Sequence, residues 1–212
     1  MKNMNEKSLS DFLEALSSKA PIPGGGGASA LIGAIGISLC SMVANLTSGK
    51  QKYAEYQSDI DNILSYASVS IPLLLNLIEK DAEVFEPLTN AYSIPKENPN
   101  RNEILEHALV TACSVPMTIL KKVANVINII EQLSTKGSKL ALSDVGVAAS
   151  ACRCAMEGAV MNIYINTKLM KNHDYAIQLI SEAETILDDG VNRCNTIYQK
   201  ITNELRNTYC RN

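Results

Sequence analysis

Apolar residues recur every three to four positions along most of this chain, which is the spacing that places them on one face of an α-helix. The first stripe predicts a short helix before residue 21, with Ser8 or Ser10 as its N-cap. The apolar members of this stripe are Leu9, Phe12, Leu13 and Leu16. Longer stripes predict further helices over residues 28–47, 51–86, 101–133, 143–170 and 175–206.

The predicted helix over residues 28–47 carries small residues in rows four positions apart. These rows are Ala30, Ala34 and Ser38, then Gly36, Cys40 and Ala44, beside a row of the large residues Leu31, Ile35, Leu39 and Val43. Small residues let helix backbones approach one another closely. We therefore expect a central helix that is buried nearly all round.

Prolines and polar residues divide the predicted helices. Pro72 and Pro116 lie within helical stripes, where each is expected to kink or split its helix. Residues 87–100 contain three prolines and form the clearest predicted loop, and no alternating runs typical of strands occur. We expect an all-α, antiparallel up-and-down bundle of about six or more helices, two of them proline-kinked. A single domain would span residues 1–212, with frayed ends at 1–7 and 207–212.

Composition and charge narrow the function classes. The core must be aliphatic, because the chain has no Trp and only two Phe. Its net charge of −3 does not provide the positive surface that binds nucleic acid. Six cysteines occur mostly in apolar stretches, which favours a reducing cytoplasm. Cys152 and Cys154 would point to different sides of a helix and the chain has two histidines, so no metal site is expected.

A membrane-spanning helix is the alternative to a soluble bundle. Residues 20–49 carry no charge, and a stretch of this length could cross a bilayer. It begins with prolines and four glycines, however, and lacks closely flanking aromatic anchors on both sides. Residues 1–11 are polar and do not resemble a secretory signal. We therefore expect a soluble protein with no membrane partner.

The first candidate site is the run Pro23, Gly24, Gly25, Gly26 and Gly27 at the start of a predicted helix. Glycines expose backbone N–H groups and a helix start attracts negative charge, so the run could cradle an anion. A flexible turn is the simpler interpretation. No Gly-Lys-Ser/Thr follows and no strand precedes the run, which excludes a P-loop and a dinucleotide fingerprint.

A second candidate site gathers Asn45, Lys50 and Lys52 at the other end of the same predicted helix. These groups could bind an anionic ligand. Lysines near a helix C-terminus are also favourable simply as partners of the helix dipole.

The third candidate site consists of Asp81, Asp144, Asn162 and Asn166, which are polar residues within apolar helical stretches. Each also has an ordinary interpretation. Asp81 could be a solvated surface carboxylate, Asp144 a helix N-cap, and the two asparagines partners in an interhelical hydrogen bond.

Taken together, these blocks resemble the formiminotransferase-cyclodeaminase family, in its cyclodeaminase/methenyltetrahydrofolate cyclohydrolase domain. The resemblance covers roughly residues 9–204. Its motifs are the Pro-x-Pro-Gly-Gly-Gly run, residues 42–50 with Tyr53, Asp81 with Phe85, the Ser-Asp block at 143–149, Gly158-Ala159 and residues 162–166. The family usually has serine where this chain has Gly27, so a hydroxyl contact to the ligand would have to come from Ser29 or be lost.

The resemblance implies a folate-dependent enzyme of one-carbon metabolism that is a homodimer or higher homo-oligomer. Its substrate would be a tetrahydrofolate derivative, including polyglutamylated forms, and no tightly bound cofactor is implied. Asp81 or Asp144 would stabilise the cation and move a proton, while the other would bind the pterin. The glycine run, with Lys50 or Lys52, would bind the anionic glutamate tail. Asn45, Asn162 and Asn166 would orient the substrate.

Two alternatives stay open at this point. The residues do not separate a cyclohydrolase from a cyclodeaminase, which is an ammonia-lyase, although the lack of a transferase domain in these 212 residues leans toward the former. The chain could also be a non-catalytic helical oligomerisation or folate-binding module, whose buried polar groups are structural. An enzyme requires Asp81 or Asp144 to share a pocket with the glycine run.

Overall fold

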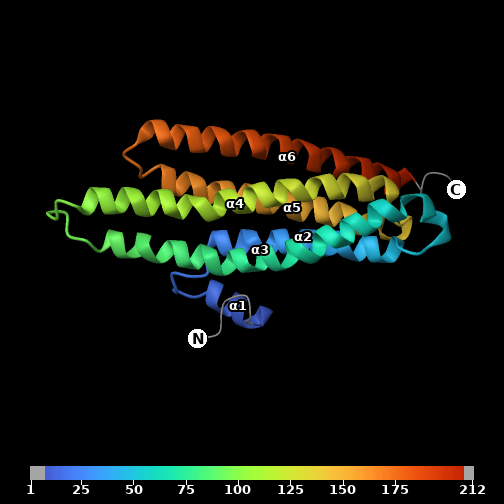
Figure 1. Ribbon diagram of the computed structural model, residues 1–212, viewed down its shortest axis with the longest axis horizontal. Coiled ribbons are helices and arrows are strands. Elements are labelled where there is room, and N and C mark those ends of the chain that lie inside the picture. Colours follow the sequence, from blue (N-terminus) through green and yellow to red (C-terminus); the bar gives the residue numbers. More distant parts are fainter. Residues whose placement is uncertain (1–7, 208–212) are drawn as a thin grey trace.

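The structure is a computed structural model that describes residues 8–207, and these residues form helices joined by short turns (Figure 1). The helices are α1 (Leu9–Leu16), α2 (Gly25–Thr47), α3 (Gln57–Tyr92), α4 (Arg101–Lys136), α5 (Leu142–Thr167) and α6 (His173–Asn207). Two 3₁₀ helices, Gln51–Tyr56 and Lys139–Ala141, precede α3 and α5. No strand occurs within residues 8–207, which confirms the predicted all-α class. The predicted frayed ends and Cys210 lie outside the described residues, apart from Asn207.

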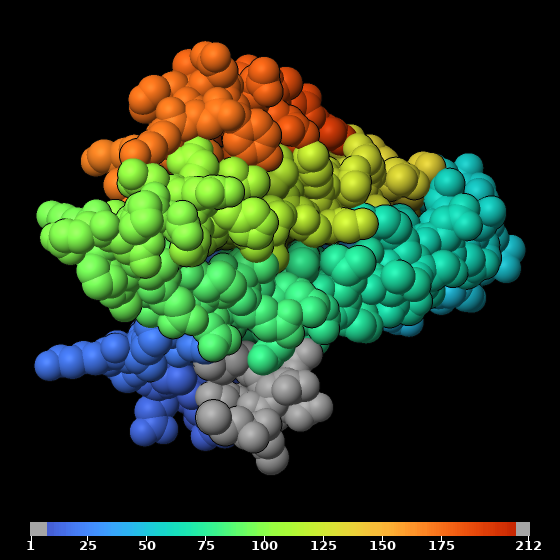
Figure 2. Space-filling model, turned by 60° about the vertical axis from the view of Figure 1, so that its left-hand side comes forward, coloured from blue at the N-terminus to red at the C-terminus, as the bar shows by residue number. Residues whose placement is uncertain are grey.

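The core lies between α2, α3, α4 and α5, with α6 packed against α4 and α5 (Figure 1). Its largest fully buried side chains are aliphatic, including Ile37, Ile60, Leu120, Ile127 and Ile163. Burying one such side chain stabilises the fold by about 1.5–3 kcal/mol. The short helix α1 lies beside the bundle next to α3, and its Phe12 is buried. Figure 2 shows this blue N-terminal segment under the green α3, with the orange α6 at the opposite edge.

Small residues bring α2 and α5 close together, as the sequence pattern predicts. A Cβ added at Gly36 would lie 2.6 Å from Cys152 Sγ, and one added at Gly158 would collide with Ser29 Oγ. The expectation that α2 is buried nearly all round is wrong, however. Ile35 is 47% exposed, and Met42 and Leu46 are exposed as well. Helix α2 therefore has one face in the bundle and one apolar face on the surface.

Several predicted boundaries differ from the observed ones. Helix α2 begins at Gly25 rather than near residue 28, so three glycines form its first turn. Helix α3 runs without a break through Pro72 and Pro87 to Tyr92. Leu88 and Ala91 are buried and hold this last part of α3 in the core. The free energy gained by burying them offsets the loss of the backbone hydrogen bond that each proline removes.

The start of α5 also differs from its prediction. Helix α5 begins at Leu142 after Ala141, so Ser143 and Asp144 lie in its first turn and neither is the N-cap. A carboxylate in the first turn still interacts favourably with the helix dipole.

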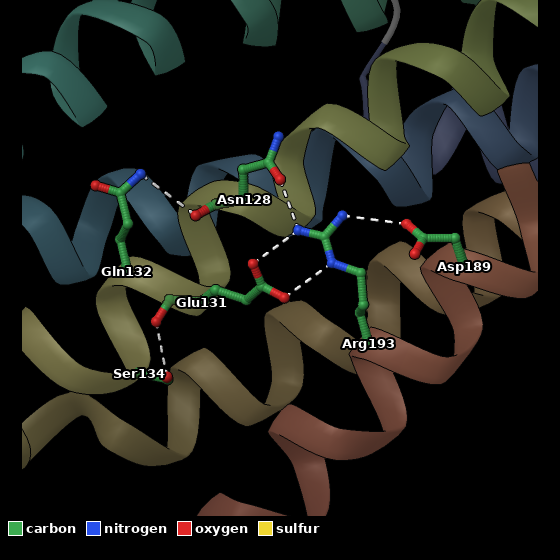
Figure 3. Close-up of polar contacts among 6 residues, drawn as sticks. All are labelled: Asn128, Glu131, Gln132, Ser134, Asp189 and Arg193. Carbon is green, nitrogen blue, oxygen red and sulfur yellow. Dashed lines mark hydrogen bonds and ion pairs between the residues drawn. The ribbon is translucent and has the colours of Figure 1, made fainter.

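An ion-pair network joins α4 to α6 (Figure 3). The Arg193 guanidinium donates to both Glu131 carboxylate oxygens, at 2.8 and 2.7 Å, and to Asn128 Oδ1 at 2.6 Å. It also pairs with Asp189 at 3.2 Å. The Arg193 hydrogen bonds lower the pKa of Glu131, because they favour the charged carboxylate. The bidentate contact between Arg193 and Glu131 fixes the position of α6 on α4.

Three helical stretches are long and apolar enough, by length and composition, to cross a membrane. They are Gly25–Thr47, Gln51–Tyr92 and Arg101–Lys136. In the structure these stretches pack against one another and contribute much of the core.

Candidate functional site

A pocket lies at the N-terminal end of α2, where the loop before this helix meets α3, α4 and α5. Its volume is about 150 Å³. The residues that line it are Pro21, Ile22, Gly24, Gly25, Asp81, Val84, Phe85, Ala112, Pro116, Asn162, Ile165 and Asn166. Gly24 and Gly25 of the glycine run, Asp81 and both asparagines therefore share one pocket, as the enzyme interpretation requires.

Asp81 is fixed against the first turn of α2. The backbone N–H of Gly27 donates to Asp81 Oδ2 at 2.9 Å. A Cβ at Gly26 would overlap the same carboxylate, so glycine is needed there for the close approach. Burial raises the pKa of Asp81, and the Gly27 hydrogen bond partly offsets this by favouring the charged form. Asp81 is therefore a partly desolvated carboxylate, not the solvated surface group of the simpler interpretation.

The two asparagines lie on the α5 side of the pocket. Asn162 Nδ2 donates to the Gly158 carbonyl at 2.8 Å within α5, which orients the amide. A Cβ added at Gly25 would lie 3.2 Å from Asn162 Nδ2, so the start of α2 packs directly on this side chain. Asn166 lies one turn further along α5 and lines the same pocket. Amide groups placed in this way can bind both donors and acceptors of a heterocycle.

The apolar walls of the pocket were largely missed by the sequence analysis. Phe85 is the exception, because its four-residue spacing from Asp81 places both on one face of α3. Pro116 and Ile165 come from α4 and α5, and their helical stripes give no sign that they border a pocket rather than the core. Only the packing of four separate segments reveals them.

Four predicted ligand residues, Pro23, Gly26, Gly27 and Ser29, support the pocket without lining it. Pro23 is buried and packs near Gly27. Ser29 is 3% exposed, and its hydroxyl donates to the Gly25 carbonyl at 2.7 Å. Because the Ser29 hydroxyl lies between α2 and α5, it does not replace the family's hydroxyl at Gly27 in this pocket, and the other expected alternative, loss of that contact, fits the structure.

The other predicted site residues lie at the opposite end of the two packed helices α2 and α5. They are Asn45, Lys50, Lys52 and Asp144. Helices α2 and α5 are antiparallel, since Gly25 adjoins Asn162 and Gly36 adjoins Cys152. Asp144 precedes Asn162 by eighteen residues on α5, which corresponds to about 27 Å along the helix. Asn45 and Lys50 lie at that same far end, after the long course of α2. The expectation that these groups, with Lys52, join Asp81 within one chain is wrong.

Two of the larger hollows lack this combination of groups. One, of about 320 Å³, lies between α5 and α6 around Arg153, and the other, of about 340 Å³, lies between α3 and α4 around Asn125. Neither contains a glycine-rich helix start or a buried carboxylate. Within residues 8–207, no three His, Cys, Asp or Glu side chains are grouped so that they could hold a metal.

The Asp81 pocket combines a carboxylate, two amides and apolar walls. A carboxylate of this kind can stabilise a neighbouring cation and exchange a proton with water or an amine. The aromatic and aliphatic walls suit a flat ring, which the amides would orient. This set of groups fits addition or elimination at a cationic carbon in a heterocycle.

Comparison with known proteins points to the same chemistry. The sequence pattern of the family described as Formiminotransferase-cyclodeaminase matches residues 8–185. A methenyltetrahydrofolate cyclohydrolase from Methylorubrum extorquens is 34% identical over 203 residues, which cover 94% of this chain and 98% of that protein. A formimidoyltransferase-cyclodeaminase from Mus musculus is 28% identical, and the match covers 85% of this chain but 35% of the mouse protein.

A solved structure is also similar over nearly its whole length. The crystal structure of formiminotetrahydrofolate cyclodeaminase from Thermotoga maritima superposes with a TM-score of 0.81 at 26% identity. The superposition covers 93% of this chain and 98% of that one.

Proposed function

This chain belongs to the formiminotransferase-cyclodeaminase family, and from this membership we propose that it is a methenyltetrahydrofolate cyclohydrolase. It is an enzyme of folate one-carbon metabolism. The observation that carries the proposal is the half-buried Asp81 carboxylate beside the start of α2 in a pocket with two amides. The similarity to the Methylorubrum extorquens cyclohydrolase, over 98% of that protein, supports hydrolysis as the reaction.

Hydrolysis requires a water molecule to add to a cationic carbon. In methenyltetrahydrofolate this carbon lies between N5 and N10 and shares their positive charge. The Asp81 carboxylate would stabilise the cation and accept a proton as the water oxygen bonds to the carbon. The proton would then pass to the nitrogen whose bond to this carbon breaks, while the hydroxyl formed from the water releases its remaining proton to solvent and becomes the formyl C=O.

The other pocket residues would bind and orient the substrate. Asn162 and Asn166 would hydrogen-bond the pterin edge, and Phe85 would pack on the ring. The N–H groups at Gly24 and Gly25 lie at the positive end of α2, which suits an anionic or electron-rich substrate group.

Cyclodeamination is the second candidate reaction. The similarity to the Thermotoga maritima cyclodeaminase favours it. In this reaction N10 of formimidoyltetrahydrofolate bonds to the formimidoyl carbon and the formimidoyl nitrogen leaves as ammonia, to which a carboxylic acid can donate a proton. The raised pKa of Asp81 would make that donation easier.

Replacement of Asp81 tests the proposal. We expect Asp81→Asn to lower kcat/KM for methenyltetrahydrofolate by about 10²–10⁴-fold, because the amide can neither accept the proton nor balance the cation. The wild-type rate should fall as the pH is lowered through the pKa of Asp81, which burial places above its ordinary value. After the uncatalysed rate is subtracted, the rate of the Asp81→Asn variant should not show this fall at low pH.

The matched control is Asp188→Asn on the exposed side of α6, which lies away from the pocket. It should retain wild-type activity and the same pH profile. Near-normal turnover by Asp81→Asn would contradict the assigned role.

We further propose that the protein is cytoplasmic and that it acts on its substrate without a tightly bound cofactor. Cys40, Cys113, Cys152 and Cys194 are buried, unpaired thiols, which supports a reducing compartment. Cell fractionation with activity measurement tests the location.

A further inference from the structure

Helices α3 and α4 lie side by side along the surface of the bundle (Figure 2). Between them is a hollow of about 340 Å³, bounded by residues 62–66 of α3 and residues 125–132 of α4. We refer to this hollow as the α3–α4 groove. Its volume falls in the range of about 300–1,000 Å³ that is typical of small-molecule sites.

The α3–α4 groove is separate from the Asp81 pocket. No residue lines both. On α4, Pro116 lines the Asp81 pocket and Asn128 lines the groove. These two residues are twelve positions apart, which corresponds to about 18 Å along the helix.

The floor of the groove is apolar, and an aromatic ring lies beside it. Ile63 and Ile129 line the groove and are 2 and 6% exposed. Tyr66 also lines it, and its ring is half-buried against the core. This combination favours a flat ligand, which can stack on the ring while it covers the apolar floor.

The other side chains that line the groove are all carboxamides. They are Asn62 from α3, and Asn125, Asn128 and Gln132 from α4. Exposed helix faces usually carry charged side chains, but no charged residue is among the described residues that line this groove. The groove therefore offers a ligand hydrogen bonds without charge.

Cations on the neighbouring helical turns are already paired with carboxylates. Lys136 pairs with Asp59 at 2.6 Å, and Arg193 pairs with Glu131 at 2.7 Å. Because these cations are neutralised within the protein, the surroundings of the groove add little attraction for an anionic ligand.

Two of the four carboxamides are held by hydrogen bonds (Figure 3). Asn128 Oδ1 accepts a hydrogen bond from Arg193 at 2.6 Å, so Asn128 Nδ2 points away from Arg193 and can donate to a ligand. Gln132 Nε2 donates to the Asn128 carbonyl at 3.4 Å, which leaves Gln132 Oε1 as an acceptor. Groups that are oriented before binding lower its entropic cost.

The other two carboxamides can turn toward a ligand. Within residues 8–207, the side chains of Asn62 and Asn125 form no hydrogen bond with another residue. A carboxamide presents a donor and an acceptor side by side. This pair matches the adjacent donor and acceptor on the edge of a purine, as when Asn or Gln binds N6 and N7 of adenine.

We propose that the α3–α4 groove is a second ligand site of this protein and that it binds an uncharged purine, as the free base or the nucleoside. The purine stacks on Tyr66 above the two isoleucines, and the carboxamides bind its edge. A phosphate group adds no affinity, because no cation lines the groove among the described residues. Binding there does not depend on the proposed reaction at Asp81, because the two sites share no residue.

Equilibrium dialysis of the whole chain with adenosine and with guanosine tests the proposal. We expect saturable binding of at least one of them at one site per chain. Its affinity should be the same at about 0.05 M and about 0.5 M salt, because salt screens only charges. The corresponding 5′-monophosphate should bind no more tightly, and glucose should not bind. Failure of both nucleosides to bind at millimolar concentration, or a preference for the monophosphate or for glucose, would overturn the proposal.

Substitutions show whether the bound purine lies in the groove. Asn125→Ala and Gln132→Ala should each weaken binding by about 2–12-fold, because each removes one hydrogen bond. Tyr66→Leu should weaken it by about 5–150-fold through loss of stacking, whereas Tyr66→Phe keeps the ring and should bind as the wild type does. The matched control is Asn76→Ala, which removes an exposed amide of α3 outside the groove. Wild-type affinity in a chain with both Asn125→Ala and Gln132→Ala would refute the site.

The Asp81→Asn variant separates this site from the proposed active site. It should bind the purine with wild-type affinity while its turnover of methenyltetrahydrofolate falls. Loss of purine binding in this variant would place the purine in the Asp81 pocket and refute the second site. Purine binding by a wild type that turns over no folate supports the second site and refutes the cyclohydrolase proposal alone.

Discussion

Asp81 is the residue on which the proposed chemistry depends, and the first turn of α2 determines where its carboxylate lies. The Gly27 N–H holds one oxygen at 2.9 Å, while Gly26 leaves room for the carboxylate. The position of a reacting group matters because a displacement of about 1 Å can cost about 10²-fold in rate.

We therefore expect Gly26→Ala to lower kcat/KM by about 10²-fold with the helical fold intact, because its Cβ would displace the Asp81 carboxylate. The neighbouring Gly27→Ala should cause a smaller loss, since its Cβ would meet Ile78 and Pro23 at an ordinary 3.5 Å. Steady-state kinetics of both variants check this. Equal losses would mean that the glycines act through backbone flexibility and not through the approach to Asp81.

For single residues, the sequence predicted which residues belong to the candidate site better than it predicted the role of each. The resemblance named both Asp81 and the glycine run as site residues but did not pair them, and periodicity alone could not, because Asp81 and Gly27 lie 54 positions apart. Ser29 was misassigned because its hydroxyl bonds within α2, which depends on the local helix start at Gly25. Pro116 and Ile165 could not be predicted as pocket walls, since only tertiary packing distinguishes them from core residues.

At the scale of the elements, the contact between α2 and α5 positions the site. Gly36 and Gly33 allow α2 to approach its neighbours, and the same antiparallel packing brings Gly25 onto Asn162. The sequence pattern predicted this close packing from small residues at four-residue spacing. It did not predict the exposed face of α2, because an apolar surface face and an apolar core face have the same composition.

We expect Gly36→Ala to lower the free energy of unfolding by about 1–3 kcal/mol, because its Cβ would lie 2.6 Å from Cys152 Sγ and force α2 away from α5. Gly146→Ala on α5 is the matched control, because its Cβ would meet Ile201 at 3.5 Å and the helix would gain from alanine. Denaturant unfolding measures both. A Gly36→Ala variant as stable as Gly146→Ala would show that the two helices can separate without cost.

At the scale of the whole molecule, the bundle presents two polar ends joined by an apolar face. The pocket with Asp81 lies at one end and the Asn45, Lys50 and Asp144 group at the other. The fold class and the number of helices followed from hydrophobic periodicity. The distance between the pocket and the Asn45, Lys50 and Asp144 group could not be predicted in this way, because it depends on the antiparallel packing of α2 and α5.

Hydrolysis of methenyltetrahydrofolate is the reaction proposed for this molecule. The most direct measurement compares initial rates of the purified protein with methenyltetrahydrofolate, followed by loss of near-ultraviolet absorbance, and with formimidoyltetrahydrofolate, followed by ammonia release. We expect protein-dependent loss of methenyltetrahydrofolate that Asp81→Asn abolishes, at a rate well above any release of ammonia. Ammonia release without this loss would assign the chain to cyclodeamination, and silence with both substrates would contradict the account.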